Sequence, residues 1–138
     1  MVDSLSPEER SIRMGLVRNR DTQPELAVRK AASVLGYRYR LHSRRLPGCP
    51  DLVFARLRVV VFVHGCFWHR HPRCARTRIP KSRQSFWIRK FEENVERDRR
   101  SRRALRAAGW RVVVIWECQT EDPIKLVALL SKTLGAHS

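Results

Sequence analysis

The amino-acid sequence predicts a single α/β domain in which helices cover a small mixed β-sheet. At 138 residues the chain is long enough for one hydrophobic core and too short for two ordinary domains. Three β-rich runs lie at residues 51–54, 58–64 and 110–117. Segments with helical periodicity lie before, among and after these runs, which is the order expected of a mixed sheet with helices packed on it.

The first helix is expected to begin after Asp21 and to stop at Gly36. Thr22 suits the N-cap position, Glu25 stands three residues later as in a capping box, and Pro24 falls in the first turn. The apolar face expected to pack on the core comprises Leu26, Ala27, Ala31, Val34 and Leu35.

A strand and a hairpin are expected next. Residues 37–42 alternate apolar with basic side chains, as a half-buried strand does. The first two β-rich runs are separated by a short connection, which favours an antiparallel hairpin. With its turn near residues 56–57, Asp51 lies opposite residues 62–64, so its carboxylate is expected to face His64.

A long helix is expected over residues 82–109, with Gly109 as its stop. Its apolar stripe consists of Phe91, Val95 and Leu105. Asp98 and Arg102 occupy the positions on the same face of the helix between Val95 and Leu105. A carboxylate on the inward face of a helix needs a partner. We therefore expect Asp98 to have a partner in the interior.

The last two elements are a buried strand over residues 110–117 and a helix over residues 122–135, with Asp122 as its N-cap. The strand delivers Glu117 and Cys118 at its end.

The charge of the chain points to a polyanionic partner. The formal net charge is +16, from 29 Lys+Arg against 13 Asp+Glu, which favours nucleic acid. The alternative is a basic surface that is merely solvated. Residues 1–20 form a basic N-terminal arm that either wraps DNA or is disordered, and residues 21–138 form the domain.

No segment of the sequence suggests a membrane partner. The longest apolar run, residues 59–63, is far too short to span a bilayer, and the N-terminus lacks the apolar core of a signal peptide. We expect a monomer in the cytoplasm. In that reducing compartment four cysteines favour a metal over a disulfide framework.

The segment "HGCFWHRHPRC" at residues 64–74 carries the metal prediction. Structural zinc takes four soft or borderline ligands in a tetrahedron. This loop offers Cys66, Cys74 and a histidine, and Cys118 can be the fourth ligand if the third β-rich run lies beside the second. Spacing leaves open which of His64, His69 and His71 binds. The alternative is a set of unrelated thiols and surface histidines, and Cys49 is left over.

Asp51 and Glu25 are candidates for a second, harder metal. Asp51 follows a proline at the mouth of the hairpin, as in the metal-binding half of a Pro-Asp...(Asp/Glu)-x-Lys nuclease motif, although the second half is missing. Such a carboxylate suits Mg²⁺, which prefers charged oxygens. The alternatives are a turn aspartate and a capping-box glutamate.

Phe67 and Trp68 are candidates for contact with DNA bases. They lie inside a polar, histidine-rich loop, where exposed aromatic rings stack on bases or wedge between them. The alternative, which also applies to Phe86 and Trp87, is a place in the core.

Several segments together resemble the very short patch repair (Vsr) mismatch endonucleases. They are "NRDTQPE", "LPGCPDLVF", "VVFVHGCFWHRH", "FWIRKFEENVERDRR" and "GWRVVVIWEC", and they span residues 19–118. The resemblance implies a restriction-endonuclease-like fold with a structural zinc. It also implies a Mg²⁺-dependent enzyme that nicks the T-containing strand on the 5′ side of a T·G mismatch left by deamination of 5-methylcytosine.

The resemblance assigns ligands to both metals. Magnesium would be held by Asp51, by the main-chain carbonyl of Val63 and, through a water, by Glu25. The zinc ligands would be Cys66, His71, Cys74 and Cys118.

The resemblance also assigns the chemistry and the DNA contacts. His69 would activate the attacking water, Asp98 would orient His69, and His64 would lie against the scissile phosphate. The residues expected to insert beside the mismatch or to contact DNA are Phe67, Trp68, Trp87 and Met14. Mismatch-repair proteins are further expected partners. Two rival functions remain open, a zinc-containing module that binds distorted DNA without cleaving it and a Vsr-like nuclease with other DNA targets.

Overall fold

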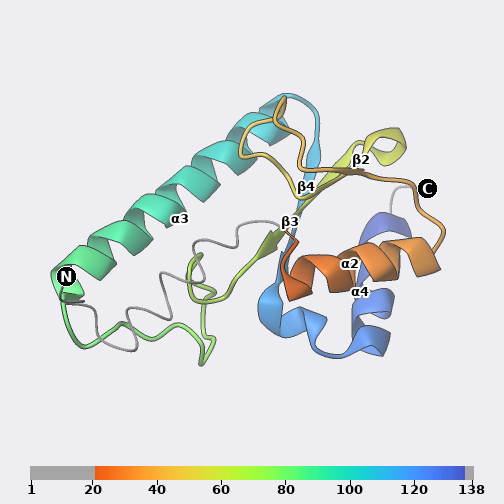
Figure 1. Ribbon diagram of the computed structural model, residues 1–138. Coiled ribbons are helices and arrows are strands. Elements are labelled where there is room, and N and C mark those ends of the chain that lie inside the picture. The colour runs from red at the N-terminus through yellow and green to blue at the C-terminus, as the bar shows by residue number, and fades with distance from the viewer. Residues whose placement is uncertain (1–20, 136–138) are drawn as a thin grey trace, which may run out of the picture.

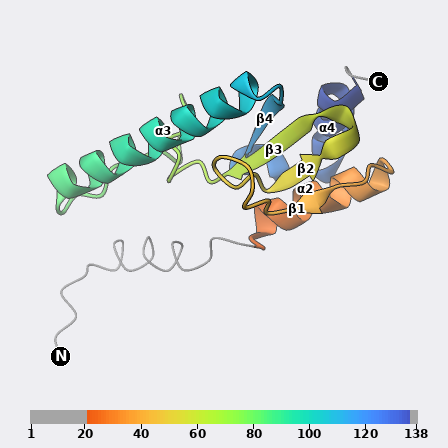
Figure 2. The same ribbon diagram turned by 90° about the horizontal axis from the view of Figure 1, so that it is seen from above.

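The computed structural model describes residues 21–135, and these residues form a mixed α/β domain with a four-stranded sheet between helices (Figures 1 and 2). Its elements are α2 (Gln23–Val34), β1 (Arg40–Leu41), β2 (Leu52–Phe54), η1 (Ala55–Leu57), β3 (Val59–His64), α3 (Gln84–Ala107), β4 (Arg111–Trp116), η2 (Glu117–Thr120) and α4 (Pro123–Gly135). The predicted basic arm, including Met14, lies outside the described residues. Within them, no helix is long and apolar enough to cross a membrane.

The sheet has the order β1-β2-β3-β4, with two antiparallel pairings followed by a parallel one. Leu52 lies opposite Val61, which confirms the predicted hairpin register. His64 at the end of β3 lies opposite Trp116 at the end of β4. The second and third β-rich runs therefore lie side by side, as the Cys118 prediction required.

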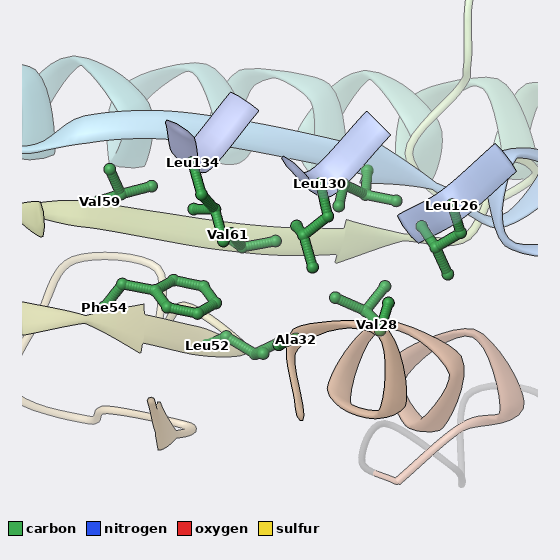
Figure 3. Close-up of a cluster of buried hydrophobic side chains, with 11 residues drawn as sticks. Val28, Ala32, Leu52, Phe54, Val59, Val61, Leu126, Leu130 and Leu134 are labelled. Atoms are coloured by element: carbon green, nitrogen blue, oxygen red, sulfur yellow. The ribbon is translucent and has the colours of Figure 1, made fainter. Parts of the chain in front are cut away.

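The alternation of β3 divides the core between the two faces of the sheet. Val59 and Val61 point to the face covered by α2 and α4, where Leu126 and Leu130 complete a buried cluster (Figure 3). Val60 and Phe62 point to the opposite face and pack with Leu105 near the C-terminal end of α3.

The predicted long helix is confirmed as α3, but only its C-terminal part packs on the sheet. Its N-terminal half extends beyond the strands (Figure 1). There Trp87 and Phe91 form a third buried cluster with Phe67 and Trp68 of the β3–α3 loop. The loop that carries the cysteines and histidines is thus held against this half of the helix.

The predicted helix ends are largely correct. The Thr22 hydroxyl accepts a hydrogen bond from the Glu25 N–H at 3.4 Å, and the Asp122 carboxylate caps α4 through the N–H groups of Ile124 and Lys125. Glu25 does not complete the capping box at Thr22, because its Oε2 accepts from the Asp21 N–H instead, at 2.6 Å.

The predicted apolar faces were wrong at three positions. Leu26 and Val34 of α2 are 41% and 67% exposed, whereas Val28 and Ala32 are buried. The helix has to face both the sheet and α4, which turns the row containing Val28 inward. Val95 belongs to the N-terminal half of α3, and it is 41% exposed.

Two strands also differ from the predictions. The strand expected over residues 37–42 is reduced to Arg40–Leu41, which pairs with β2 alone at the edge of the sheet. The strand predicted to be buried, β4, is buried only at Ile115 and half-buried elsewhere, because it forms the opposite edge.

Gly48 fixes the loop that leads into Asp51. Its φ is +75°, and a Cβ at this position would lie 2.7 Å from Ser101 Cβ and 3.2 Å from Phe62 Cε1. Only glycine avoids both the backbone strain and the collision. The close approach brings this loop against α3 across the site described below.

We expect Leu130→Ala to lower the free energy of unfolding by about 2–5 kcal/mol, because it opens a cavity in the cluster between α4 and the sheet. Leu130 is fully buried there. Ile124→Ala on the same helix is the matched control, since Ile124 is 83% exposed. Urea denaturation measures both variants, and equal losses would contradict this account of the core.

Candidate active site and metal centre

An open cleft of about 1100 Å³ runs between α2, the ends of β2 and β3, and the middle of α3. The side chains of acid–base or metal-binding type that line it include Glu25, His42, Asp51, His64, His69 and Asp98. All five predicted catalytic residues thus line one cavity, although they come from segments far apart in the sequence.

Asp51 lies at the floor of the cleft. Its Oδ2 accepts a hydrogen bond from the Val63 N–H at 2.6 Å, so the start of β2 is tied to the end of β3. Burial, together with the nearby charge of Glu25, raises the pKa of the Asp51 carboxyl to about 7 in spite of the Val63 hydrogen bond, which lowers it. Ionised Asp51 therefore lacks sufficient compensating charge.

Glu25 brings a second carboxylate to the same end of the cleft. It is 3% exposed, and its Oε2 lies 3.5 Å from Arg29 Nη2. Arg29 also forms an ion pair with Asp21 at 2.6 Å, so one guanidinium is shared by two carboxylates. Two acidic side chains that converge in this way favour a divalent cation.

His42 is a residue of this site that the sequence reasoning missed. Its Nε2 lies 3.4 Å from Glu25 Oε2 and 4.0 Å from Asp51 Oδ1. The His42 N–H donates to the Asp51 carbonyl at 3.1 Å. Pairing the 37–42 strand with the run that begins at Asp51 would have revealed the histidine, because an antiparallel register places it opposite that aspartate.

His64 and His69 stack on each other, with ring centroids 3.9 Å apart and an angle of 9° between the ring planes. Burial, together with the proximity of His69, lowers the pKa of His64 to about 3. The His64 ring is therefore neutral at physiological pH. Its Nδ1 is buried and has no hydrogen-bond partner among the described residues.

Asp98 has the partner that its inward position required. Its Oδ2 lies 2.5 Å from His69 Nδ1. Because a carboxylate accepts, His69 donates from Nδ1, and its neutral tautomer leaves Nε2 as an acceptor. This pair can take up a proton in the cleft.

A separate cluster lies beside the cleft, where Cys66, His71, Cys74 and Cys118 bring their donor atoms within 4.8 Å of one another. His71 Nδ1 lies 3.6 Å from Cys66 Sγ and 3.5 Å from Cys118 Sγ. Of the three loop histidines, His71 is the one that lies with the thiols, whereas His64 and His69 lie with Asp98.

The chemistry of this donor set suits a soft or borderline cation. Cys66 is fully buried, and burial raises the pKa of its thiol to about 12. A thiolate in this position needs a cation beside it. The His71 ring also stacks on Trp116, with centroids 4.3 Å apart, which fixes the orientation of the imidazole.

Two aromatic residues of the loop, Phe67 and Trp68, pack against the buried Trp87 and Phe91. The rings of Phe67 and Trp68 meet edge to face at 5.3 Å, and both residues are half-buried and line the cleft. Trp87 is 2% exposed and lies under Trp68 at 6.1 Å. It does not line the cleft. Trp87 was expected to insert beside the mismatch, but its burial leaves it packed against Trp68 instead of free to enter DNA.

Basic side chains complete the walls of the cleft. Those that line it are Arg76, Arg78, Arg97 and Arg102. The cleft thus combines two carboxylates that suit a hard cation, a histidine–carboxylate pair and a wall of arginines. This combination suits hydrolysis of a phosphodiester.

Comparisons with known proteins agree with this chemistry. The family model described as DNA mismatch endonuclease Vsr matches residues 2–76. The chain is 50% identical to "Type II nicking enzyme V.XorIIP" of Xanthomonas oryzae pv. oryzae, over 97% of this chain and 98% of that one. It is 40% identical to "DNA mismatch endonuclease Vsr" of Escherichia coli, over 91% of this chain and 80% of that one. The chain therefore belongs to the Vsr family of DNA endonucleases.

Proposed function

We propose that this protein nicks the T-containing strand of a T·G mismatch on the 5′ side of the T, by Mg²⁺-dependent phosphodiester hydrolysis, and so begins very short patch repair. The observation that carries the proposal is the meeting, in one cleft, of the Asp51–Glu25 carboxylates, the His69–Asp98 pair and the aromatic pair. Similarity to proteins named mismatch endonuclease and nicking enzyme supports it.

Asp51, the main-chain carbonyl of Val63 and, through a water, Glu25 would hold magnesium. The raised pKa of Asp51 supports this assignment, because it marks carboxylates brought together without enough positive charge. Mg²⁺, when bound, neutralises charge that builds on the phosphorane-like transition state. His42, which lies beside both carboxylates, would keep them turned toward each other.

His69 would accept the proton of the attacking water at Nε2, since Nδ1 is engaged by Asp98. Asp98 would hold the tautomer and stabilise the imidazolium as it forms. His64, kept neutral by burial, would lie against the scissile phosphate and donate a hydrogen bond. This division of labour needs one imidazole to take a proton and the other to remain neutral.

Phe67 and Trp68 would enter the duplex beside the mismatch, with Trp87 as their buried support. A T·G wobble stacks poorly, so unstacking is easier there than at a matched pair. Met14 and the basic arm would approach from the minor groove. Mismatch-repair proteins are the further partners that we propose.

Zinc is the ion that we propose for the Cys66, His71, Cys74 and Cys118 cluster. Three thiols and an imidazole form a donor set that zinc favours, and four protein ligands leave no open position, as in structural sites. The cluster would hold the loop that carries His69 and the aromatic pair.

With Mg²⁺, the purified protein should nick a duplex that carries one T·G mismatch. Asp51→Ala should lower the nicking rate by at least about 10³-fold, because the carboxylate that holds the cation is lost, while DNA binding persists. Strand-labelled duplexes on a denaturing gel measure nicking, and Asp122→Ala, which alters only a helix cap, is the carboxylate control.

Matched duplexes and a panel of all mismatches in randomised flanks complete this assay. Binding without nicking across several divalent metals would favour the binding-module rival. Nicking without preference for T·G would favour a nuclease with other targets.

Asp51→Asn should stabilise the protein in the absence of added divalent cation, and only at higher pH. The folded pKa of Asp51 is about 7, against an ordinary value of 3.8. Its carboxyl therefore contributes stability below pH 3.8 that is lost as the pH rises through about 7. We expect a gain on the order of 2 kcal/mol at pH 8, which shrinks toward pH 4.

Thermal unfolding at several pH values, with and without Mg²⁺, measures this effect. Added Mg²⁺ should stabilise the wild type and reduce its difference from the variant. A difference between the two proteins that is independent of pH would refute the role assigned to burial of Asp51.

Metal analysis should find about one zinc per chain. Cys118→Ser should lose the ion and much of the stability, whereas Cys49→Ser should retain both, since Cys49 lies outside the cluster. A stable wild-type protein without zinc would overturn the assignment.

A further inference from the structure

Arg70 joins three parts of the β3–α3 loop. Its Nη1 donates to the carbonyls of Phe67 at 3.3 Å and Arg78 at 3.0 Å, and its Nη2 donates to the carbonyl of Thr77 at 2.9 Å. One guanidinium therefore ties the backbone of the aromatic pair to the later part of the loop, before α3 begins.

The same guanidinium also contacts the rings of Phe91 and Phe67. Its Cζ lies 4.2 Å from the centroid of the Phe91 ring and 5.6 Å from that of Phe67. Arg70 thus holds Phe67 through both its backbone and its ring. A planar cation in contact with an aromatic face is stabilised most where water is excluded, and Phe91 is 4% exposed.

Arg70 does not line the cleft that holds the carboxylates and histidines. It lines a smaller apolar pocket of about 330 Å³ beside α3, together with Ile79, Ile88 and Val95. It also lies outside the donor cluster of the cysteines. Apart from its charge, Arg70 can therefore act on DNA only through the groups that it holds, and two of its contacts are with Phe67.

We propose that Arg70 is a positioning residue that fixes the Phe67–Trp68 pair for entry into the duplex and so sets the preference for distorted over regular DNA. The first part depends only on the contacts above, and the second rests on the proposed function. Lysine cannot replace Arg70, because an ammonium group has neither the planar face nor the fork that reaches three carbonyls.

The test compares Arg70→Lys and Arg70→Met with Arg73→Met. Arg73 lies in the same loop and shares the left-handed backbone conformation, with φ of 59° against 54° for Arg70. Its replacement therefore imposes the same charge loss and comparable backbone strain. Affinity is measured for a T·G duplex and its matched T·A counterpart, and 2-aminopurine beside the mismatch reports unstacking.

In both Arg70 variants the ratio of affinities for the T·G and the matched duplex should fall about tenfold, because charge-assisted hydrogen bonds and ring stacking are removed. The 2-aminopurine signal, which reports unstacking, should fall together with this ratio. Arg73→Met should weaken binding to both duplexes equally. In a Trp68→Ala background, Arg70→Met should cause little further loss, because the two changes act through one element.

Hydrogen exchange of the free protein tests the positioning itself, without reference to any substrate. The loop at residues 66–80 should exchange faster in both Arg70 variants than in the wild type or Arg73→Met, with the metal content unchanged. If Arg70→Met fails to fold, Arg70→Lys decides.

The outcomes separate the two proposals. A wild type that shows no preference for T·G refutes the proposed function, and exchange then decides the role of Arg70 alone. A wild type that discriminates, with Arg70 variants that discriminate equally well, overturns the present inference. Loss of metal from Arg70→Lys also overturns it, because the residue would then act through the cysteine cluster.

Discussion

The parallel pairing of β3 with β4 is the constraint on which the site depends. His64 and Trp116 are the last residues of these strands and lie opposite each other. The chain therefore leaves both strands at the same end of the sheet. This meeting brings Cys118 to the loop cysteines. Parallel strands also require a crossover, and here the crossover consists of the histidine-rich loop and α3. The helix returns past the loop with Asp98 against His69. The thiol cluster and the histidine–carboxylate pair thus follow from one strand pairing.

The cleft is arranged for chemistry at a cost in stability. Asp51 and Glu25 lie close together with one guanidinium and a histidine nearby, and His64 is buried without a partner for Nδ1. Such groups persist only because the rest of the fold compensates for them. The compensation comes from the apolar cluster between the sheet and the helices α2 and α4, which lies on the face away from α3.

The β3–α3 loop carries most of the site although its sequence has little means of folding alone. It contains no apolar run, and Arg70 and Arg73 adopt the left-handed conformation that non-glycine residues seldom adopt. Two sets of contacts offset this. The donor atoms of Cys66, His71 and Cys74 lie close to that of Cys118, where the proposed zinc would join them. The Arg70 guanidinium joins Phe67 to Thr77 and to the Phe91 ring. In the proposed function, a rigid loop would let His69 and the Phe67–Trp68 pair act at one base pair.

The sequence by itself determined most of the elements and the hairpin register, because periodicity and capping residues are local properties. Ligand chemistry singled out the cysteine- and histidine-rich loop and Asp51, whereas the individual roles of the site residues came from the resemblance to a family. The need of Asp98 for a partner also followed from its place on a helix stripe. Spacing left open which loop histidine joins the thiols; the resemblance implied His71, and the tertiary structure places it there. Only the tertiary structure decided that His42 lies beside two carboxylates and that Trp87 is buried against Trp68. It also decided which faces of α2 and α3 are buried, and Leu26, Val34 and Val95 are exposed in spite of their apolar spacing. These features depend on which segments pack together in space. The spacing of residues along the chain shows which of them share a face of a helix or strand, but it does not show which other segment covers that face.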